Sequence, residues 1–180
     1  MTQTAKNPNS TARLIIVLFL ISAITALALG LVNYVTAPRI AAIEAEKSRA
    51  AMEEVLPAES YEEVSYTGGD SMVTAVYRAG DAGYVVEVAP SGFGGAINMM
   101  VGVDTSGTVT GVSIVSHEET SGLGANATRE EFRSQFVGAT GSVAVTKDGG
   151  TIDALTGATV TSRAVSNGVN AALNAVASLG

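Results

Sequence analysis

The sequence predicts an α+β fold, in which one N-terminal transmembrane helix is followed by an α+β domain. Three observations lead to this prediction: a long uncharged apolar segment near the N-terminus, several glycine-punctuated β-type runs after Pro57, and a helical pattern at the C-terminal end. All 17 acidic residues lie at Glu44 or later. The chain therefore divides into a cationic, apolar first part and an acidic second part that is long enough to form its own core.

The composition excludes several classes of function. The 180 residues are 47% hydrophobic and 15% charged, against about 25% charged in a typical soluble domain, which excludes a disordered chain and indicates a membrane segment. Without any cysteine, the chain has no disulfides, thiolate metal sites or iron–sulfur clusters, and we expect no metal site. The net charge of −7 argues against a nucleic-acid partner, because phosphate binding needs clustered lysines and arginines.

The segment from Leu14 to Val35 carries no charge and is dominated by Leu, Ile, Val and Ala. As a helix it spans roughly the 30 Å of a bilayer's hydrocarbon core, and Tyr34 falls where an aromatic ring rests among the headgroups. The alternative is a cleaved signal peptide, since the segment before it is basic and Ala26-Leu27-Ala28 resembles a cleavage site. The length of residues 14–35 favours a retained transmembrane helix.

Residues 36–57 are expected to form a helical stalk, because they are rich in Ala, Glu, Lys and Arg and end at Pro57. The domain that follows, residues 58–180, changes to short β-type runs separated by glycine. The last two runs are joined by a hairpin-like turn, Asp104-Thr105-Ser106-Gly107. We expect four strands, at residues 72–78, 83–89, 96–104 and 108–116.

A helix is predicted over residues 126–137. Asn126 or Thr128 serves as its cap, and Phe132 and Phe136 are one turn apart.

Residues 142–146 suit another strand. The last helix is expected to begin near Ala158 and to run to about Ala177. Its apolar face is formed by Val165, Val169, Leu173 and Val176.

Three stretches are candidates for chemistry, and the first is Asp153-Ala154-Leu155-Thr156-Gly157-Ala158-Thr159. It lies at the expected start of the last helix, where Asp and Thr are good caps, and capping is its simpler interpretation. Glycine and alanine also leave room for a bulky group against the backbone, and a helix N-terminus favours an anion such as a phosphate. A hydroxyl in this stretch is well placed to carry that phosphate.

The second stretch runs from His117 to Gly124, directly after a predicted strand. It can be read as a solvated loop, with His117 as a surface or hydrogen-bonded histidine. The glycines on either side of Leu123 indicate instead a tight loop that presents backbone amides and an apolar side chain to a flat partner. The third stretch, Ser91 to Gly95, by itself is typical of a glycine-rich turn before a strand.

Together, and in this order behind one N-terminal span, the stretches resemble the G subunit of the Rnf ion-translocating electron transport complex. This family has an FMN-binding domain and is related to the C subunit of the sodium-pumping NADH:quinone reductase. The resemblance rests on a glycine-aromatic-glycine-glycine turn, a β-hairpin, a Glu-Thr-Ser-Gly-Leu-Gly loop and the final Asp-x-x-Thr-Gly-Ala-Thr. Ser121 stands where the family usually has proline.

The resemblance implies a site as well as a fold. A flavin transferase joins FMN through its phosphate to the hydroxyl of Thr159, and Asp153 is the residue that the transferase recognises. The other cofactor-binding residues that the resemblance implies are Thr156, Gly157, Ala158, Glu119, Thr120, Gly122, Leu123, Gly124, Gly94 and Gly95.

The function that the resemblance implies is electron transfer through covalent FMN in an ion-translocating ferredoxin:NAD⁺ oxidoreductase. The chain is then one part of a larger enzyme, with no independent active site and no catalytic residue. Its partners are the other membrane and iron–sulfur subunits and the flavin transferase. Two alternatives stay open: the C subunit of a sodium-pumping NADH:quinone reductase, and a membrane-anchored, non-redox ligand-binding or sensor module. Gly92-x-Gly94 lacks the full G-x-G-x-x-G pattern, so we do not expect this chain to oxidise NADH directly.

Charge counting does not decide the orientation in the membrane, because basic residues lie on both sides of the span. The flavin transferases of the family act outside the cytoplasm. The resemblance therefore implies that residues 1–13 stay in the cytoplasm and that residues 58–180 lie on the periplasmic face of a bacterial inner membrane.

Overall fold

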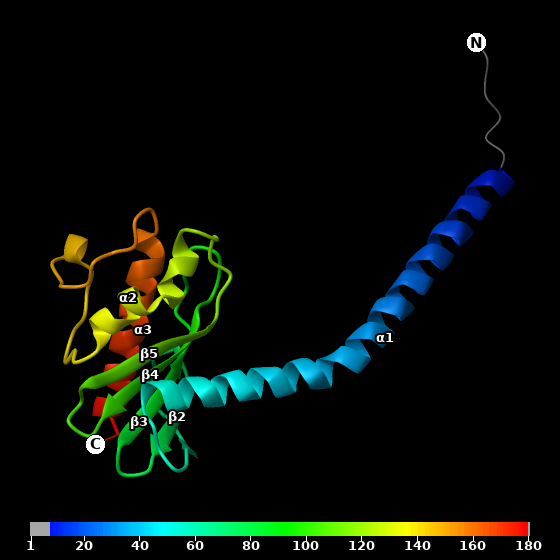
Figure 1. The fold of residues 1–180 in the computed structure, drawn as a ribbon. Helices are drawn as coiled ribbons and strands as arrows, with labels where there is room; N and C mark the ends of the chain where they lie inside the picture. Colours follow the sequence, from blue (N-terminus) through cyan, green and yellow to red (C-terminus); the bar gives the residue numbers. More distant parts are fainter. Residues whose placement is uncertain (1–7, 180) are drawn as a thin grey trace. The chain divides into compact units, whose positions relative to one another are not determined.

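The computed structural model describes residues 8–179 (Figure 1). Two compact units make up the chain, and the boundary between them falls between Ala45 and Glu46. Of the predicted cytoplasmic segment, residues 1–7 lie outside the described part of the chain.

Helix α1 (Pro8–Val55) covers the predicted span and nearly all of the predicted stalk without interruption. Its residues Ala12–Val55 include a stretch that is long and apolar enough to cross a membrane, and the side chains of that stretch are not packed in a protein core. Large apolar side chains exposed in this way suit a lipid environment, which agrees with a membrane anchor. The division of the chain at residues 35 and 57 stays a prediction.

The second unit is built on an antiparallel sheet of five strands, in which each strand pairs with the next along the chain. The strands are β1 (Glu62–Val64), β2 (Val73–Ala79), β3 (Gly83–Val88), β4 (Asn98–Asp104) and β5 (Val109–Ser116). The four longer strands confirm the four predicted from the sequence. The sequence does not predict β1, because three residues with two exposed glutamates show no apolar alternation.

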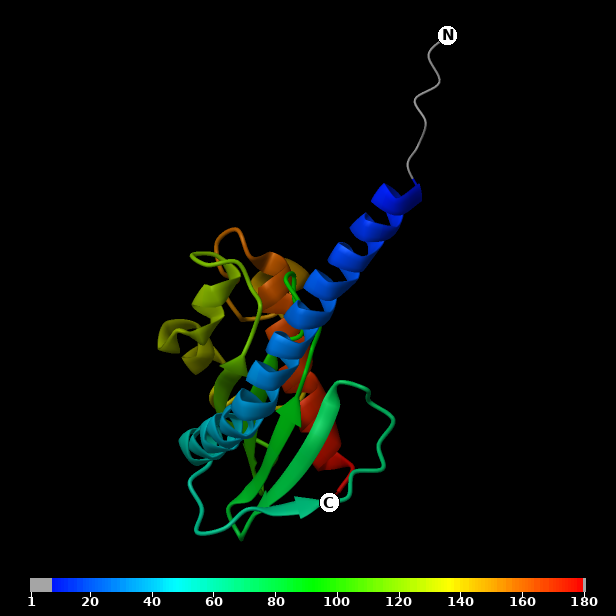
Figure 2. The same cartoon turned by 90° about the vertical axis from the view of Figure 1, so that its right-hand side faces the viewer.

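Both faces of the sheet are buried at its centre. Val85 and Val86 are adjacent in β3, so their side chains point to opposite faces, and both are fully buried. Val86 belongs to the core beneath helix α3 (Thr159–Ala177). Val85 packs instead with Val55, the last residue of α1, and with Leu56, which follows it. The last turns of α1 and helix α3 thus cover the two faces of the sheet (Figure 2).

The two outer strands of the sheet are shielded in different ways. β1 is short, and its Glu62 and Glu63 are exposed. β5 is bonded to the segment that follows it: Val109 N donates to Ala139 O over 2.9 Å, and Gly138 N donates to Val109 O over 2.8 Å. This segment covers the outer edge of β5.

Helix α3 confirms the predicted last helix and buries the predicted face. Its small residues bring it close to the sheet: a Cβ atom on Gly168 would lie 2.9 Å from Pro90 and 3.1 Å from Met99. This close contact fixes α3, and therefore its N-terminal end, against the sheet.

The predicted helix over residues 126–137 is wrong as one element. The segment forms three short pieces, because Arg129 has an extended backbone (φ −72°, ψ 143°) that interrupts the helix. The predicted caps Asn126 and Thr128 both fall in the first piece, so neither caps the α-helix. Phe132 and Phe136 do keep the predicted contact, edge to face, with ring centroids 5.5 Å apart. The pieces are η1 (Gly124–Thr128), α2 (Glu130–Arg133) and η2 (Ser134–Phe136).

The predicted strand at residues 142–146 is also wrong. Val145 forms a single parallel bridge with Ile152. The side chain of Asn170 on α3 accepts a hydrogen bond from Val143 N at 2.7 Å and donates one to Val143 O at 2.8 Å. The backbone of Val143 is therefore satisfied by a helix side chain, and that of residues 144–146 is bonded to Gly150 and Ile152 of the same loop instead of a long strand. A short 3₁₀ helix, η3 (Thr146–Asp148), follows.

Candidate functional site

A cavity of about 380 Å³ opens beside the N-terminus of α3. Four segments supply its walls: the turn before β4, the loop after β5, the η3 turn and the residues around the start of α3. The lining residues are Phe93, Glu119, Thr120, Leu123, Gly124, Lys147, Gly157, Ala158, Thr159, Val160 and Thr161. The three stretches that the sequence singles out therefore meet at one place.

Within the described part of the chain, no acceptor pairs with the first backbone N–H groups of α3, so they are free for a ligand. Ala158 occupies the N-cap position and has no side chain that can accept a hydrogen bond. Gly157 just before it has a φ of +75°, which a residue with a side chain rarely adopts. Ser162, inside the helix, accepts a hydrogen bond from Leu155 N at 3.0 Å and so fixes the approach to the helix. The interpretation of this stretch as a source of capping side chains for α3 is therefore wrong.

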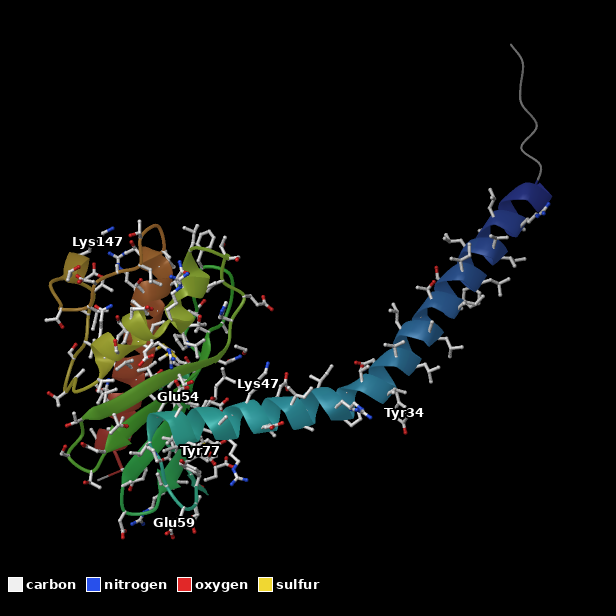
Figure 3. All side chains as sticks on the ribbon, in the orientation of Figure 1. Tyr34, Lys47, Glu54, Glu59, Tyr77 and Lys147 are labelled. Atoms are coloured by element: carbon white, nitrogen blue, oxygen red, sulfur yellow. The ribbon has the colours of Figure 1, made fainter. Side chains whose placement is uncertain are left out.

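Thr159 is the first residue of α3, lines the cavity and is partly exposed. Its hydroxyl oxygen accepts a hydrogen bond from Lys147 Nζ at 3.2 Å. Lys147 lies in η3, at the end of the domain where α3 begins (Figure 3). The Thr159 hydroxyl is thus open to a reactant and has a cation beside it.

Glu119 forms the polar floor of the cavity and is only 8% exposed. Its Oε1 accepts hydrogen bonds from Phe93 N at 2.8 Å and Gly94 N at 3.0 Å, and its Oε2 accepts one from the Thr161 hydroxyl at 2.6 Å. Burial by itself raises the pKa of Glu119, but these three donors, together with the charge of nearby His117, outweigh it and hold the pKa below its usual value of 4.5. Glu119 is therefore an ionised, fully engaged carboxylate that joins three walls of the cavity.

Three glycines leave the space in which this carboxylate lies. A Cβ atom on Gly92 or Gly124 would collide with a carboxylate oxygen of Glu119, and one on Gly94 would collide with the backbone oxygen of Glu118. These glycines of the second and third stretches therefore allow close approach to Glu119, and Gly124 does so without a positive φ.

Apolar side chains surround the mouth of the cavity. Phe93 is 73% exposed, Val160 49% and Leu123 43%, and all three line the cavity. Leu123 lies close to Gly157, where an added Cβ atom would be 3.1 Å from its Cδ2. Exposed apolar side chains beside free amides and a cation fit a ligand with a flat ring at one end and a phosphate at the other.

Of the predicted site residues, seven line the cavity: Glu119, Thr120, Leu123, Gly124, Gly157, Ala158 and Thr159.

The other predicted site residues, Gly94, Gly95, Gly122, Asp153 and Thr156, lie outside its lining. Gly94 supports Glu119, and Asp153 is held through its backbone, with its N–H donating to Gln135 Oε1 at 2.7 Å. The predicted roles of these residues in flavin binding and transferase recognition stay predictions.

Sequence reasoning misses Lys147 and Thr161. Lys147 is twelve residues from Thr159 and comes directly after a predicted strand, and no local pattern connects the two. One signal is available: Lys147 is the sole lysine after Lys47, in the acidic part of the chain.

The chain is similar to known proteins over most of its length. The FMN-binding domain family matches residues 92–174. The chain is 35% identical to the G subunit of the ion-translocating oxidoreductase complex of Methanosarcina acetivorans, over 91% of this chain and 93% of that protein. It is 34% identical to the G subunit of the Na(+)-translocating ferredoxin:NAD(+) oxidoreductase complex of Acetobacterium woodii, over 86% of each. The G subunit of the proton-translocating ferredoxin:NAD(+) oxidoreductase complex of Clostridium ljungdahlii is 47% identical over 52% of each chain.

Proposed function

Since this chain belongs to the family of G subunits of ion-translocating oxidoreductase complexes, we propose that it relays electrons through FMN as a membrane-anchored part of a ferredoxin:NAD⁺ oxidoreductase complex. FMN supplies the redox chemistry, and the protein supplies its position and electrostatic surroundings. The other membrane and iron–sulfur subunits of the complex are its electron-transfer partners. Relatives named for sodium and for proton translocation are both similar to the chain, so either ion fits this proposal.

The proposal includes a covalent bond between FMN and Thr159. The observation that carries it is the partly exposed Thr159 hydroxyl, at the mouth of a cavity with apolar walls and beside the free amides that start α3. Those amides and Lys147 suit the phosphate, while Phe93 and Leu123 suit the flavin ring.

The attachment is a phosphoryl transfer without oxidation or reduction. Thr159 Oγ1 forms a bond to the flavin phosphorus of a donor in which the FMN phosphate is joined to a second phosphate by an anhydride. The anhydride P–O bond breaks, and the second phosphate leaves with its electron pair. The hydroxyl proton passes to a base of the flavin transferase or to water. A phosphodiester retains FMN without the need for a deep pocket.

The proposed topology follows from the same step. A flavin transferase that acts outside the cytoplasm needs Thr159 on the same side of the membrane. The apolar helix then serves as an uncleaved anchor, with the FMN domain on the periplasmic face of a bacterial inner membrane.

The test is the mass of the intact chain after co-expression with a flavin transferase. We expect the polypeptide mass plus one FMN less one water, and a fluorescent band that survives denaturing electrophoresis. A bare polypeptide mass would contradict covalent attachment and favour a non-redox ligand-binding module. Iron–sulfur subunits that purify with the chain and accept electrons from ferredoxin distinguish this complex from a sodium-pumping NADH:quinone reductase.

A further inference from the structure

We propose that Lys147 is the phosphate-binding residue of this site and that the Asp148–Arg163 ion pair positions it beside Thr159. The inference rests on the proposed attachment of FMN to Thr159. It assigns the residue that recognises the phosphate of the flavin donor and then holds the phosphodiester.

The first support is the contact itself. Lys147 Nζ donates to Thr159 Oγ1 at 3.2 Å, so its charge lies beside the atom that bonds to the flavin phosphorus. Among the described residues that line the cavity, Lys147 is the sole cation. Once Thr159 Oγ1 is an ester oxygen, the charged non-bridging oxygens of the phosphate are the stronger acceptors for this ammonium group.

The second support is the Asp148–Arg163 ion pair, which places Lys147 against the face of α3 that carries Thr159. Thr159 and Arg163 are four residues apart in α3, so they share one face of the helix. Arg163 donates from Nε to Asp148 Oδ2 and from Nη2 to Asp148 Oδ1, both at 2.6 Å. Consecutive residues of η3, Lys147 and Asp148, therefore contact consecutive turns of α3.

The loop that carries Lys147 and Asp148 is itself stabilised by backbone hydrogen bonds. Thr146 N donates to Ile152 O at 2.8 Å, and Gly150 N donates to Val145 O at 3.1 Å. Asn170 on α3 anchors the start of the same segment through Val143. Lys147 thus projects from a braced turn, which lowers the entropy cost of holding its charge at one point.

The third support is the charge of the surroundings. The chain carries a net charge of −7, and all of its acidic residues lie after the span. An anionic flavin donor that approaches this domain is repelled unless a local cation offsets the field. Lys147 is the sole lysine after Lys47, and it lies at the acceptor hydroxyl.

The experiment measures the rate of covalent FMN incorporation into the full-length chain in detergent, with a flavin transferase and its donor. Lys147→Gln removes the charge, Lys147→Arg keeps it, and Lys47→Gln is the matched control because Lys47 is an exposed lysine outside the site. We expect Lys147→Gln to lower kcat about tenfold or more, Lys147→Arg to recover most of the rate, and Lys47→Gln to match the unaltered chain.

Three outcomes contradict the inference: an unchanged rate for Lys147→Gln, equal slowing by Lys147→Arg, or a rise in the KM for the chain with kcat unchanged. The last outcome assigns Lys147 to docking of the transferase. Failure of the proposed function gives a different result. In that case either the unaltered chain gains no covalent FMN, or the Thr159→Ala variant still gains it.

The ion pair is tested by charge exchange. Asp148→Arg alone is expected to slow FMN incorporation several-fold, and the double variant Asp148→Arg with Arg163→Asp to restore most of the rate by re-forming the pair in reverse. A double variant as slow as the single one contradicts the positioning role. Thermal unfolding of each variant separates slow incorporation from loss of fold.

Discussion

The Thr161 hydroxyl donates to Glu119 Oε2 over 2.6 Å and so joins the first turn of α3 to the loop after β5, 42 residues earlier in the chain. The same carboxylate binds the backbone of the turn before β4 through its other oxygen. Glu119 therefore sets the spacing of three walls of the proposed flavin site while its own oxygens are occupied.

Replacing this carboxylate is expected to destabilise the domain in a pH-dependent way. Glu119→Gln keeps an acceptor for the two backbone amides but loses the acceptor for Thr161, at a cost of about 1–3 kcal/mol near pH 7. The pKa of Glu119 is lowered on folding, so its contribution is present above the unfolded-state pKa and is lost as the pH falls through the folded-state pKa. The stability difference between the two proteins should therefore shrink below about pH 4.5.

Denaturant unfolding at pH 7 and pH 4 measures this difference. Taking the difference between the two proteins cancels the contributions of the other carboxylates. A gap that stays constant with pH would contradict the ionised state assigned to Glu119.

Thr159→Ala is expected to abolish covalent FMN and to change stability by less than about 1 kcal/mol. The Thr159 hydroxyl does not cap α3, where Ala158 holds the N-cap position, so its loss leaves the helix start intact. Thr140→Ala is the matched control, since Thr140 is exposed, outside the cavity lining and not among the predicted site residues. In-gel flavin fluorescence checks both variants. Covalent FMN on Thr159→Ala would move the attachment to another hydroxyl.

Leu123→Ala is expected to shift the flavin absorption spectrum or potential while covalent attachment persists. Leu123 is 43% exposed at the mouth of the cavity, so its truncation changes the surroundings of the ring more than the core. Val137→Ala is a control of similar exposure away from the cavity. If the flavin of Leu123→Ala is indistinguishable from that of the control, the loop after β5 does not contact the ring.

Asp153→Ala is expected to reduce FMN loading far more than it reduces stability. The carboxylate is exposed, and the residue is held through its backbone by Gln135, so the stability change should stay within about 0.5 kcal/mol. Loading is measured by intact mass and stability by thermal unfolding. Full loading of a less stable protein would show that Asp153 is structural and is not read by the transferase.

Reporter fusions test the orientation. Alkaline phosphatase joined after Gly180 should be active, and a fluorescent protein that cannot mature after export should be dark at the same position. The reverse pattern would place the domain in the cytoplasm and separate Thr159 from an extracytoplasmic transferase.

The fold could be predicted where a local pattern determines it. Alternation of apolar residues indicates β2 to β5, and the spacing of Val165, Val169 and Leu173 indicates α3. The local pattern fails where tertiary contacts determine the backbone conformation. Asn170 satisfies Val143, and no strand forms there, although the residues have the composition of one.

The candidate site shows the same limit. A motif could single out Thr159, because the residues that define it are neighbours in the chain. Lys147 could not be found in this way, because its place beside Thr159 depends on the Asp148–Arg163 pair and the path of a loop. Glu119 is present in a recognisable stretch, but its burial depends on Gly92 in a different turn as well as on Gly124 in its own stretch.

The outer strands of the sheet bear on self-association. A membrane confines anchored domains to a thin layer, where their local concentration is high and a bare strand edge would template pairing between copies. β1 offers three residues with two exposed carboxylates, and the edge of β5 is already bonded at Val109 to the segment that covers it. Mutual repulsion at one edge and occupied hydrogen bonds at the other therefore keep neighbouring copies of this domain from joining their sheets.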